Sequence, residues 1–273
     1  MTGTAAVSAE TADGAAADAV GLAESARAVL IGQIAVGVAL LGAWEIAGRQ
    51  FGHDWTSLPS LIAVRLGAWL VGDLWLHALT TAAEMLVGLA LGGSAGVVAG
   101  LVLGRSPTVA TVLRPIIVAL YSVPLITMAP LLILWFGLDL EPKIVLVTIV
   151  VFFLVFFNTF AGVAAIDGDL IASFQLLGGN RREEFQKVVA PASMVWILSG
   201  VKIALPYALV AAVTAEMLAA REGLGSLLAR AAAQFDMTGV YTVLFILMVL
   251  GMLAAEGGLR LERLLLRWRH AAG

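Results

Sequence analysis

Long apolar runs with few or no charges recur along the chain, and they limit its possible folds more than any other feature. Each run is close to the roughly 20 residues that a helix needs to cross about 30 Å of hydrocarbon. Gly and Pro inside these runs do not exclude helix, because neighbouring helices can satisfy the freed backbone groups. The runs cover residues 28–44, 85–104, 115–138, 144–166, 195–220 and 237–255. The sequence therefore predicts an all-α, polytopic membrane protein with six transmembrane helices.

The composition excludes a water-soluble globule. Hydrophobic residues make up 61% of the 273 residues and charged residues only 13%, whereas soluble domains average about 45–50% apolar and about 25% charged. The net charge of −3 gives no overall basic surface, so nucleic acid is not expected as a partner. With no cysteine and three scattered histidines, we expect no disulfide, no thiol nucleophile and no metal site.

The distribution of Lys and Arg predicts the orientation in the membrane. With the N-terminus inside, 11 of the 16 Lys and Arg residues fall on the cytoplasmic side and 5 on the other side. Because cytoplasmic loops carry an excess of these residues, we expect both termini in the cytoplasm. Residues 1–27 are Ala-rich, weakly acidic and without an apolar period, which predicts a disordered tail. Residues 28–76 would hold the first transmembrane helix and an external loop, and residues 260–273 a cytoplasmic C-terminal tail.

Five glycines recur every four residues in the second run. This spacing places them on one slowly drifting face of a helix, where another helix backbone can approach closely. Two interpretations follow, of which tight packing inside the bundle is favoured over a sliding or dimerising surface. The glycines are Gly88, Gly92, Gly96, Gly100 and Gly104.

Three charged residues lie within or at the edges of the apolar runs. Glu84, Lys202 and Glu216 occupy positions where a charge costs about 2.5–3.5 kcal/mol on insertion scales. One interpretation is a substrate path, a gate or a proton relay. The other, favoured for Glu84 and Lys202, places their charged groups at headgroup level in water. For Glu216, which lies near the rim of its run, both interpretations stay open.

The segment between the fourth and fifth runs, residues 167–192, carries the most specific signal. Its apolar positions have helical spacing on both sides of a polar stretch that begins Gly178-Gly179-Asn180. We expect two short amphipathic helices joined at this turn, with Asn180 as N-cap and a glutamate three residues later. The alternative is an interfacial helix on the lipid. A mixed-charge tip suits a protein partner better, and this tip consists of Arg181, Arg182, Glu183 and Glu184.

Enzyme motifs give only weak signals. Residues 92–96 match the G-x-S-x-G pattern of a nucleophile elbow, but that chemistry needs a strand-to-helix turn and a histidine base. None of the apolar runs contains a histidine, and the H-E-x-x-H and G-x-x-x-x-G-K-[ST] patterns are both absent. We therefore expect no catalytic residue and no cofactor in this chain. Any ATP energy must come from a partner.

The 167–192 segment resembles the signature loop of the permeases of ATP-binding-cassette (ABC) importers, known as the EAA loop. The family pattern has Glu-Ala-Ala, then three residues and a Gly, with a Pro further on. Here Gly178 takes the glycine position, and Pro191 follows 13 residues later, as in the sulfonate, nitrate and taurine branch. The sequence departs from the pattern at residues 172–174, where Ala-Ser-Phe replaces Glu-Ala-Ala.

The likeness continues through further motifs over roughly residues 58–269, among them 121–124 with 130–137, 199–205, and 215–217 followed by 223–225. It implies a type I ABC importer permease fold with a cytoplasmic coupling helix and a permease core at residues 77–259. It places the chain as a multi-pass protein in a bacterial inner membrane. Two copies would pair as a homodimer, two ATPase subunits would bind ATP and Mg, and an external binding protein would deliver the substrate.

The same resemblance implies roles for particular residues. Docking into the ATPase, with Phe185 as an apolar anchor, would involve Gly178, Gly179, Asn180, Arg181, Arg182, Glu183, Glu184, Phe185 and Pro191. Kinks and polar groups in apolar helices, together with the likeness, predict that the route between two copies is bordered by Tyr121, Ser122, Pro124, Met128, Pro206 and Glu216. The substrate would be a small anion, such as a sulfonate, taurine or nitrate, or a vitamin precursor. The alternative is a secondary transporter not driven by ATP, which would need inverted repeats and intramembrane ion ligands.

Overall fold

The computed structural model describes residues 28–50, 52, 56–105, 122–219 and 221–266, together with seven separate residues between 105 and 122. The described segments form helices joined by short turns. They fall into two units, residues 1–64 and 65–273. The expected N-terminal tail, residues 1–27, lies outside the described residues, as do Tyr121 and residues 267–273.

The first unit contains one long apolar helix, Ala28–Gln50. Most of its side chains are exposed, as lipid contact requires. Near its end, Glu45 accepts hydrogen bonds from Arg49 at 2.7 Å and from the Ser60 hydroxyl at 2.8 Å. Helix α2 (Pro59–Leu70) starts with a proline. Proline is favourable at the first position of a helix, because the backbone N–H that it lacks would have no partner within the helix there. The first apolar run is therefore a single helix whose end is closed by a polar turn.

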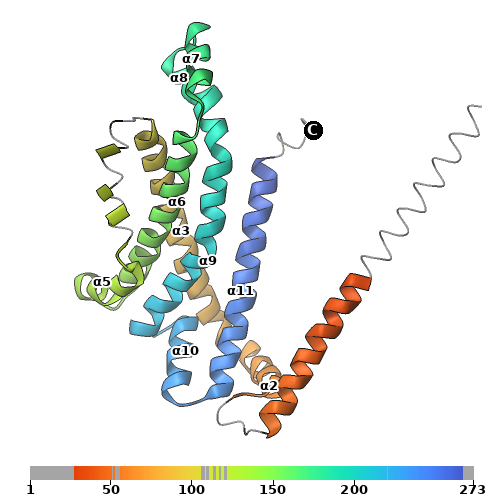
Figure 1. Cartoon of the computed structure of the whole chain (residues 1–273). Helices are drawn as coiled ribbons and strands as arrows, with labels where there is room; N and C mark the ends of the chain where they lie inside the picture. The colour runs from red at the N-terminus through yellow and green to blue at the C-terminus, as the bar shows by residue number, and fades with distance from the viewer. Residues whose placement is uncertain are drawn as a thin grey trace, which may run out of the picture. The chain divides into compact units, whose positions relative to one another are not determined.

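Four more long apolar helices belong to the second unit: α3 (Leu74–Gly104), α6 (Glu141–Ala164), α9 (Ala190–Ala219) and α11 (Met237–Leu265). With Ala28–Gln50, they make five helices in the described part of the chain that are long and apolar enough to cross a membrane. Figure 1 shows α3, α6 and α9 side by side, with α11 next to α9. The all-α membrane fold is confirmed, and α11 stays helical into the segment expected as a C-terminal tail.

Short helices occupy the two ends of the second unit. α7 (Gly168–Leu176) and α8 (Arg181–Glu184) form a hairpin at one end, and α10 (Leu224–Ala233) lies at the opposite end (Figure 1). A single π-helical turn, η2 (Phe185–Val189), connects α8 to α9. Pro191 is the second residue of α9. Because proline has no N–H to donate to the preceding turn, that turn can widen without losing a hydrogen bond.

The third apolar run differs from the expected continuous helix. Much of residues 106–121 lies outside the described part. The later part of the run forms η1 (Leu125–Met128) and α5 (Ala129–Phe136). Pro124 is extended (φ −63°, ψ 93°) and interrupts the helix before η1. α5 then ends at Gly137, whose φ of +87° favours glycine. From Ser122 onward, the run is therefore broken into short helices, whereas one span over residues 115–138 was predicted.

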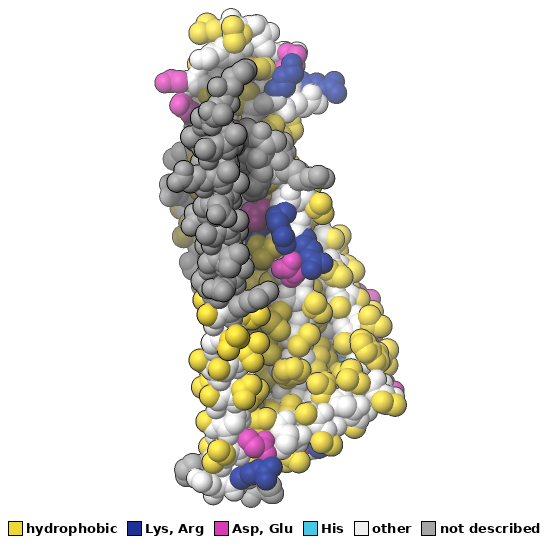
Figure 2. Space-filling model, turned by 90° about the vertical axis from the view of Figure 1, so that its right-hand side faces the viewer, with side chains coloured by type: hydrophobic (Ala, Val, Ile, Leu, Met, Phe, Trp, Pro, Cys, Tyr) yellow, Lys and Arg dark blue, Asp and Glu magenta, His cyan; other side chains and the backbone are white. Residues whose placement is uncertain are grey.

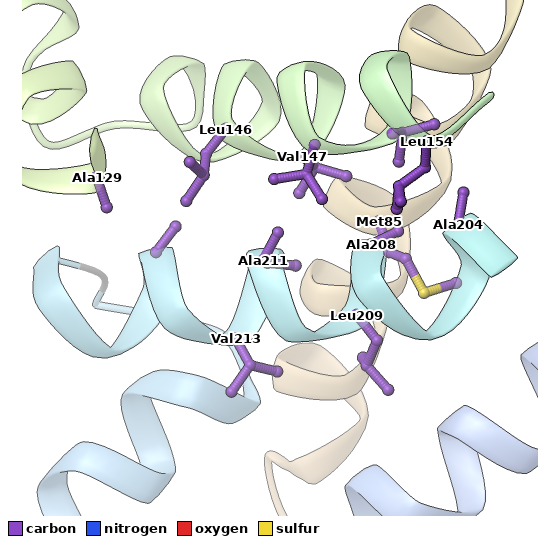
Figure 3. Close-up of a cluster of buried hydrophobic side chains, with 14 of the residues drawn as sticks. Met85, Ala129, Leu146, Val147, Leu154, Ala204, Ala208, Leu209, Ala211 and Val213 are labelled. Carbon is purple, nitrogen blue, oxygen red and sulfur yellow. The ribbon is translucent and has the colours of Figure 1, made fainter. Parts of the chain in front are cut away.

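The core of the second unit lies where α3, α6 and α9 meet. Figure 3 shows Leu146 and Val147 of α6 pointing toward α9, with Met85 of α3 in the same cluster. On its side, α9 contributes small side chains, namely Ala204, Ala208, Ala211, Ala212 and Ala215. In lipid there is no hydrophobic driving force between helices, so close packing of small against branched side chains holds the bundle together.

The surface agrees with insertion in a bilayer. On the face shown in Figure 2, hydrophobic side chains cover a broad band, and Lys, Arg, Asp and Glu gather above and below it. Large apolar side chains such as Leu86 and Val98 on α3 and Leu253 on α11 are more than half exposed. In water, an apolar patch of this extent would drive association, whereas in a membrane it contacts hydrocarbon.

Candidate functional site

The glycine face of α3 lies against α6. An added Cβ at any of the five predicted positions would come within 2.8 Å of an α6 atom. By contrast, a Cβ at Gly93, on another face, would meet nothing within 4 Å. Helix α6 of the same chain therefore occupies this face, as the tight-packing interpretation requires, and the face is not free for a second copy.

The α7–α8 hairpin is closed by a glycine turn and two helix caps. Asp167 caps α7 by accepting from the Asp169 N–H at 2.9 Å. Gly178 has φ +85°, a left-handed conformation that favours glycine. Asn180 Oδ1 accepts from the Glu183 N–H at 2.9 Å, and the Glu183 carboxylate accepts from the Asn180 N–H at 3.2 Å. The predicted Asn180 cap is confirmed, and these bonds stiffen the tip of the hairpin.

Glu184 fixes the hairpin to the end of α3. It is only 6% exposed, and its carboxylate accepts from Arg105 Nη2 at 3.2 Å and from Gln175 Nε2 at 2.9 Å. The Arg105 guanidinium also lies 5.4 Å from the centre of the Phe185 ring, within cation–π range. A cavity of about 500 Å³ adjoins this contact and is lined by Val98, Leu101, Val102, Arg105 and Phe185. Arg105 therefore connects the hairpin to the end of α3.

The apolar side chains that the hairpin exposes most are Leu176 and Leu177, at 88% and 87%. Phe185, which the sequence suggested as the anchor, is instead half-buried under Arg105. Glu184, expected in the polar surround of that anchor, is buried as well. Helical spacing within residues 167–192 does not show that Arg105, at the end of α3, lies over Phe185. The most exposed apolar side chains therefore lie on the other side of the turn from the one the sequence suggested.

The remaining residues predicted for coupling lie around this tip. Arg181 and Arg182 are exposed at the start of α8. A Cβ at Gly179 would overlap the Phe174 ring, so glycine lets the turn fold back over α7. Pro191 is the second residue of α9, beyond the π-helical turn. The predicted coupling residues therefore form the tip of the hairpin and the start of the helix that follows it, but they do not all face outward.

The residues predicted to border a route between two copies are not all on one surface. Ser122, Pro124 and Pro206 are exposed, and Met128 is half-buried. Glu216 is 1% exposed and points into the interior of the chain. It therefore does not lie on a surface that a second copy could share, and that placement of Glu216 is corrected.

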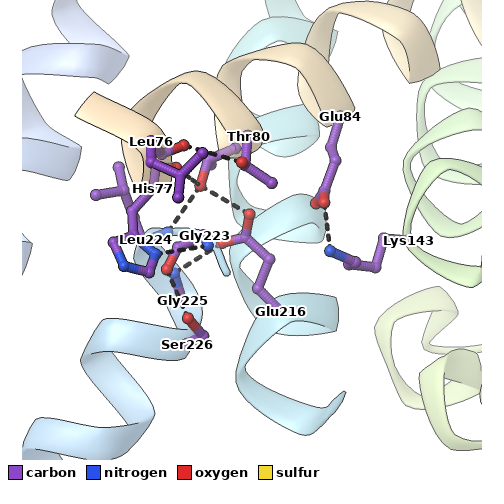
Figure 4. A network of polar contacts seen from close by, with 11 residues as sticks. Leu76, His77, Thr80, Glu84, Lys143, Glu216, Gly223, Leu224, Gly225 and Ser226 are labelled. Carbon is purple, nitrogen blue, oxygen red and sulfur yellow. Dashed lines mark hydrogen bonds and ion pairs between the residues drawn. The ribbon is translucent and has the colours of Figure 1, made fainter. Parts of the chain in front are cut away.

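Glu216 instead belongs to a buried polar network at the end of the unit opposite the hairpin (Figure 4). Its two carboxylate oxygens accept from Thr81 Oγ1 of α3 and from the Gly225 N–H of α10, both at 2.7 Å. Thr81 Oγ1 in turn accepts from the Leu224 N–H at 2.9 Å. The first N–H groups of α10 have no partner within their own helix. Side chains from α3 and α9 satisfy them.

Glycines let the turn between α9 and α10 pass close to Glu216. Gly223 has φ +109°, and its N–H donates to His77 Nδ1 at 3.0 Å. A Cβ at either Gly223 or Gly225 would overlap the Glu216 side chain. The Gly-Leu-Gly sequence at residues 223–225 is therefore required by the close approach of the backbone to a buried carboxylate.

Glu84 extends the network to α6. It is 2% exposed, and its Oε1 accepts a hydrogen bond from Lys143 Nζ, a residue that is 6% exposed. The favoured interpretation of Glu84, a charge at headgroup level in water, is therefore wrong. Lys202 differs, because it pairs with Glu262 at 2.7 Å through side chains that remain 32% and 23% exposed. We refer below to Thr81, Glu84, Lys143, Glu216 and Gly225 as the carboxylate network.

Lys143 and Thr81 are the members of this network that the sequence did not reveal. Lys143 lies just before the fourth apolar run and resembled a loop cation. A carboxylate buried in a membrane span needs a partner of opposite charge, and this requirement for Glu84 was the one signal that pointed to Lys143. Thr81 carried no signal of its own.

A bundle of apolar helices with a capped polar hairpin at one end defines a multi-pass membrane protein. Residues 92–261 match the family described as "Binding-protein-dependent transport system inner membrane component". The chain belongs to this family and is a permease subunit of an ABC importer of the inner membrane. This membership sets aside the secondary-transporter alternative.

Relatives of this chain with known names are also transport permeases. The chain is 32% identical to the formylaminopyrimidine transport permease protein ThiX of Halalkalibacterium halodurans, over 84% of this chain and 92% of that protein. It is also 32% identical to the taurine transport system permease protein TauC of Escherichia coli, over 71% of each chain. Among solved structures, an inward-facing MetNI methionine ABC transporter has a chain that aligns with a TM-score of 0.55 at 20% identity, covering 73% of this chain and 97% of that one. This last likeness concerns the fold alone.

Proposed function

We propose that the α7–α8 hairpin docks onto an ABC ATPase subunit and that Leu176 and Leu177 are its apolar anchors. The observation that carries the proposal is the nearly complete exposure of both leucines on a turn that is already ordered by the Asn180 capping box. A partner that covers them removes apolar surface from water, which is worth about 25 cal/mol per Å². Because the turn is stiff, little conformational entropy is lost on docking.

Arg105 is the element that would transmit ATPase movement to the spans. It joins the hairpin to α3 through Glu184 and Phe185, and the helix that starts at α8 continues through η2 into α9. A push on the hairpin would therefore reach two membrane helices at once, as a rigid-body movement. ATP and Mg would be bound by the ATPase, and this chain would supply neither a catalytic residue nor a cofactor site.

The proposed assembly is a homodimer of this chain with two ATPase subunits and an external binding protein. Both termini and the hairpin would lie in the cytoplasm, which agrees with the basic residues of the hairpin region, Arg181, Arg182 and Lys187. The carboxylate network would then lie toward the external side. The family description, which names binding-protein-dependent transport, supports the external partner.

We propose a small polar organic solute as substrate, either a sulfonate such as taurine or a heterocyclic vitamin precursor. The names of the relatives ThiX and TauC include one solute of each kind. The cognate binding protein selects the solute in such systems, so its thermal stabilisation by a panel of sulfonates, nitrate and pyrimidines tests the proposal. Stabilisation by nitrate alone, or only by a solute that is neither a sulfonate nor a heterocyclic vitamin precursor, would contradict it.

The docking proposal is tested by replacing both leucines with aspartate, Leu176→Asp with Leu177→Asp, in the complete transporter. We expect at least about a tenfold drop in ATPase copurification, because two charges would enter an apolar contact. Leu170→Asp is the matched control, since Leu170 is an exposed leucine at the other end of α7, and it should leave copurification unchanged. If the double variant retains the ATPase and transports normally, the hairpin does not dock through its tip.

A further inference from the structure

Three ionisable side chains from three different helices are buried together in the carboxylate network. Glu84 of α3, Lys143 of α6 and Glu216 of α9 are 2%, 6% and 1% exposed. With both carboxyl groups ionised, the cluster would hold a net charge of −1. A buried net charge is costly unless something neutralises it.

The hydrogen bonds in the cluster leave one position open. Lys143 donates to Glu84 Oε1, while the two oxygens of Glu216 accept from Thr81 and Gly225. Glu84 Oε2 is buried and has no hydrogen-bond partner among the described residues. Figure 4 shows Glu84 extending from α3 and Glu216 from α9 toward the same space, so the two carboxyl groups are neighbours between these packed helices.

A single bound proton would remove both the buried net charge and the lack of a hydrogen-bond donor for Glu84 Oε2. It brings the charge of the cluster to zero, and it turns one carboxyl group into the O–H donor that the pair lacks. Two carboxyl groups in one site commonly hold one proton between them for this reason. A metal cation fits less well, because the described residues contain no cluster of three or more His, Cys, Asp or Glu side chains placed to hold a metal ion, and the Lys143 ammonium would repel it.

We propose that Glu84 and Glu216 form a proton-binding site in which the two carboxyl groups share one proton between α3 and α9. The proton stabilises the contact of these helices and, through Gly225, the start of α10. Loss of the proton leaves two carboxylates beside one ammonium and loosens this end of the unit.

Other ionisable groups surround the site on every side. They are Lys143 from α6, Asp139 before α6, His77 from the first turn of α3, Asp73 before α3, Arg221 and Glu222 between α9 and α10, and Arg230 on α10. Among these, Lys143 touches the carboxyl pair directly. The His77 imidazole is connected to Glu216 indirectly, because it accepts from the Gly223 N–H in the turn whose Gly225 N–H donates to Glu216. We therefore expect the protonation of the pair to depend on both glutamates and on Lys143, which contacts Glu84 directly.

The experiment is infrared spectroscopy of the purified full-length permease in lipid nanodiscs, which needs no ATPase and so stands apart from the docking proposal. Wild-type protein at neutral pH should show the carbonyl band of one protonated carboxyl group. Both Glu84→Gln and Glu216→Gln should abolish this band, because either change leaves a single carboxylate to pair with Lys143. Glu222→Gln, at an exposed glutamate in the adjacent turn, should keep it. Absence of the band from the wild type, or its survival in either of the first two variants, would overturn the proposal.

Stability against pH gives a second measurement that does not depend on spectral assignment. The shared proton stabilises the folded state while it is bound and is lost as pH rises, so the wild-type Tm should fall on the alkaline side. Glu84→Gln and Glu216→Gln imitate the protonated pair, and each should remove that fall. A wild-type Tm with the same alkaline profile as both variants would also overturn the proposal.

Discussion

Charged side chains are buried at one end of the second unit, whereas leucines are exposed at the other. At the network end, Glu84 and Glu216 lie below 3% exposure with their partners on α6 and α10. At the hairpin end, Leu176 and Leu177 are nearly fully exposed. The carboxylate network joins α3, α6, α9 and α10 through hydrogen bonds between its own members and so fixes the relative positions of these four helices. Leu176 and Leu177 are covered by no other part of the described residues, and they mark the end where we propose that the ATPase docks.

The largest expected effect comes from a substitution in the carboxylate network. Lys143→Met removes the cation beside Glu84 and should lower the free energy of unfolding by about 3–5 kcal/mol, the cost of leaving a buried charge unpaired. Denaturation of the detergent-solubilised permease measures the change. Adding Glu84→Gln to Lys143→Met should recover most of the loss. If the double variant is as unstable as Lys143→Met alone, the pair does not account for the effect.

The second prediction concerns the packing that joins the two ends, the α3–α6 contact. Gly92→Ala would place a Cβ against the Thr148 backbone oxygen, and overpacking of this kind costs about 1–3 kcal/mol. Gly93→Ala, one residue later on a face where a Cβ meets nothing within 4 Å, should be neutral or stabilising, since Ala is the better helix former by up to about 1 kcal/mol. Equal Tm shifts in the two variants would show that the glycine face has no special role.

The third prediction sharpens the account of the hairpin end. Arg105→Ala removes the hydrogen bond to Glu184 and the contact with Phe185, so we expect a loss of about 1–3 kcal/mol in local stability, typical of a buried acceptor that loses a charged donor. Hydrogen exchange across residues 167–189 should rise, and transport should fall more than ATPase binding. Arg181→Ala, an exposed arginine at the tip, is the control. Unchanged exchange in Arg105→Ala would show that the hairpin is not held through α3.

The smallest expected effect is at an ion pair outside the spans. Arg65 Nη1 lies 2.7 Å from Asp236 Oδ2, with side chains 36% and 29% exposed. Partial burial raises the pKa of Asp236, but hydrogen bonds from the Gly239 N–H and from Arg65 outweigh it and hold the pKa below its ordinary value. Because the folded pKa is the lower one, the stabilisation is present above the unfolded pKa and is lost as pH falls through the folded value.

At this exposure, the Arg65–Asp236 pair should contribute no more than about 1 kcal/mol. Asp236→Asn should therefore reduce the fall in Tm between about pH 5 and pH 2 by a small amount. Asp169→Asn, at an exposed aspartate of the hairpin, serves for comparison. An acid profile of Asp236→Asn identical to that of the wild type would contradict the assignment.

Local patterns predicted the elements of this protein well. Apolar length identified the membrane helices, because the thickness of hydrocarbon sets the length of a span. The Gly178–Asn180 turn and its capping box were predictable because every bond involved lies within a few residues. The third run was the exception, since the effect of Pro124 on a membrane helix depends on which neighbours satisfy the freed backbone groups.

The sequence by itself determined that the chain is helical, spans a membrane, carries a glycine face on α3 and has a capped turn at residues 178–180. Only the tertiary structure decided that Glu84 meets Lys143, 59 residues away, and that Thr81 meets Glu216, 135 residues away. It also decided that Arg105 covers Phe185 and leaves Leu176 and Leu177 exposed. The reason is physical, because spacing along one helix specifies which residues share a face, whereas the rotation and depth of neighbouring helices depend on how all of them pack together.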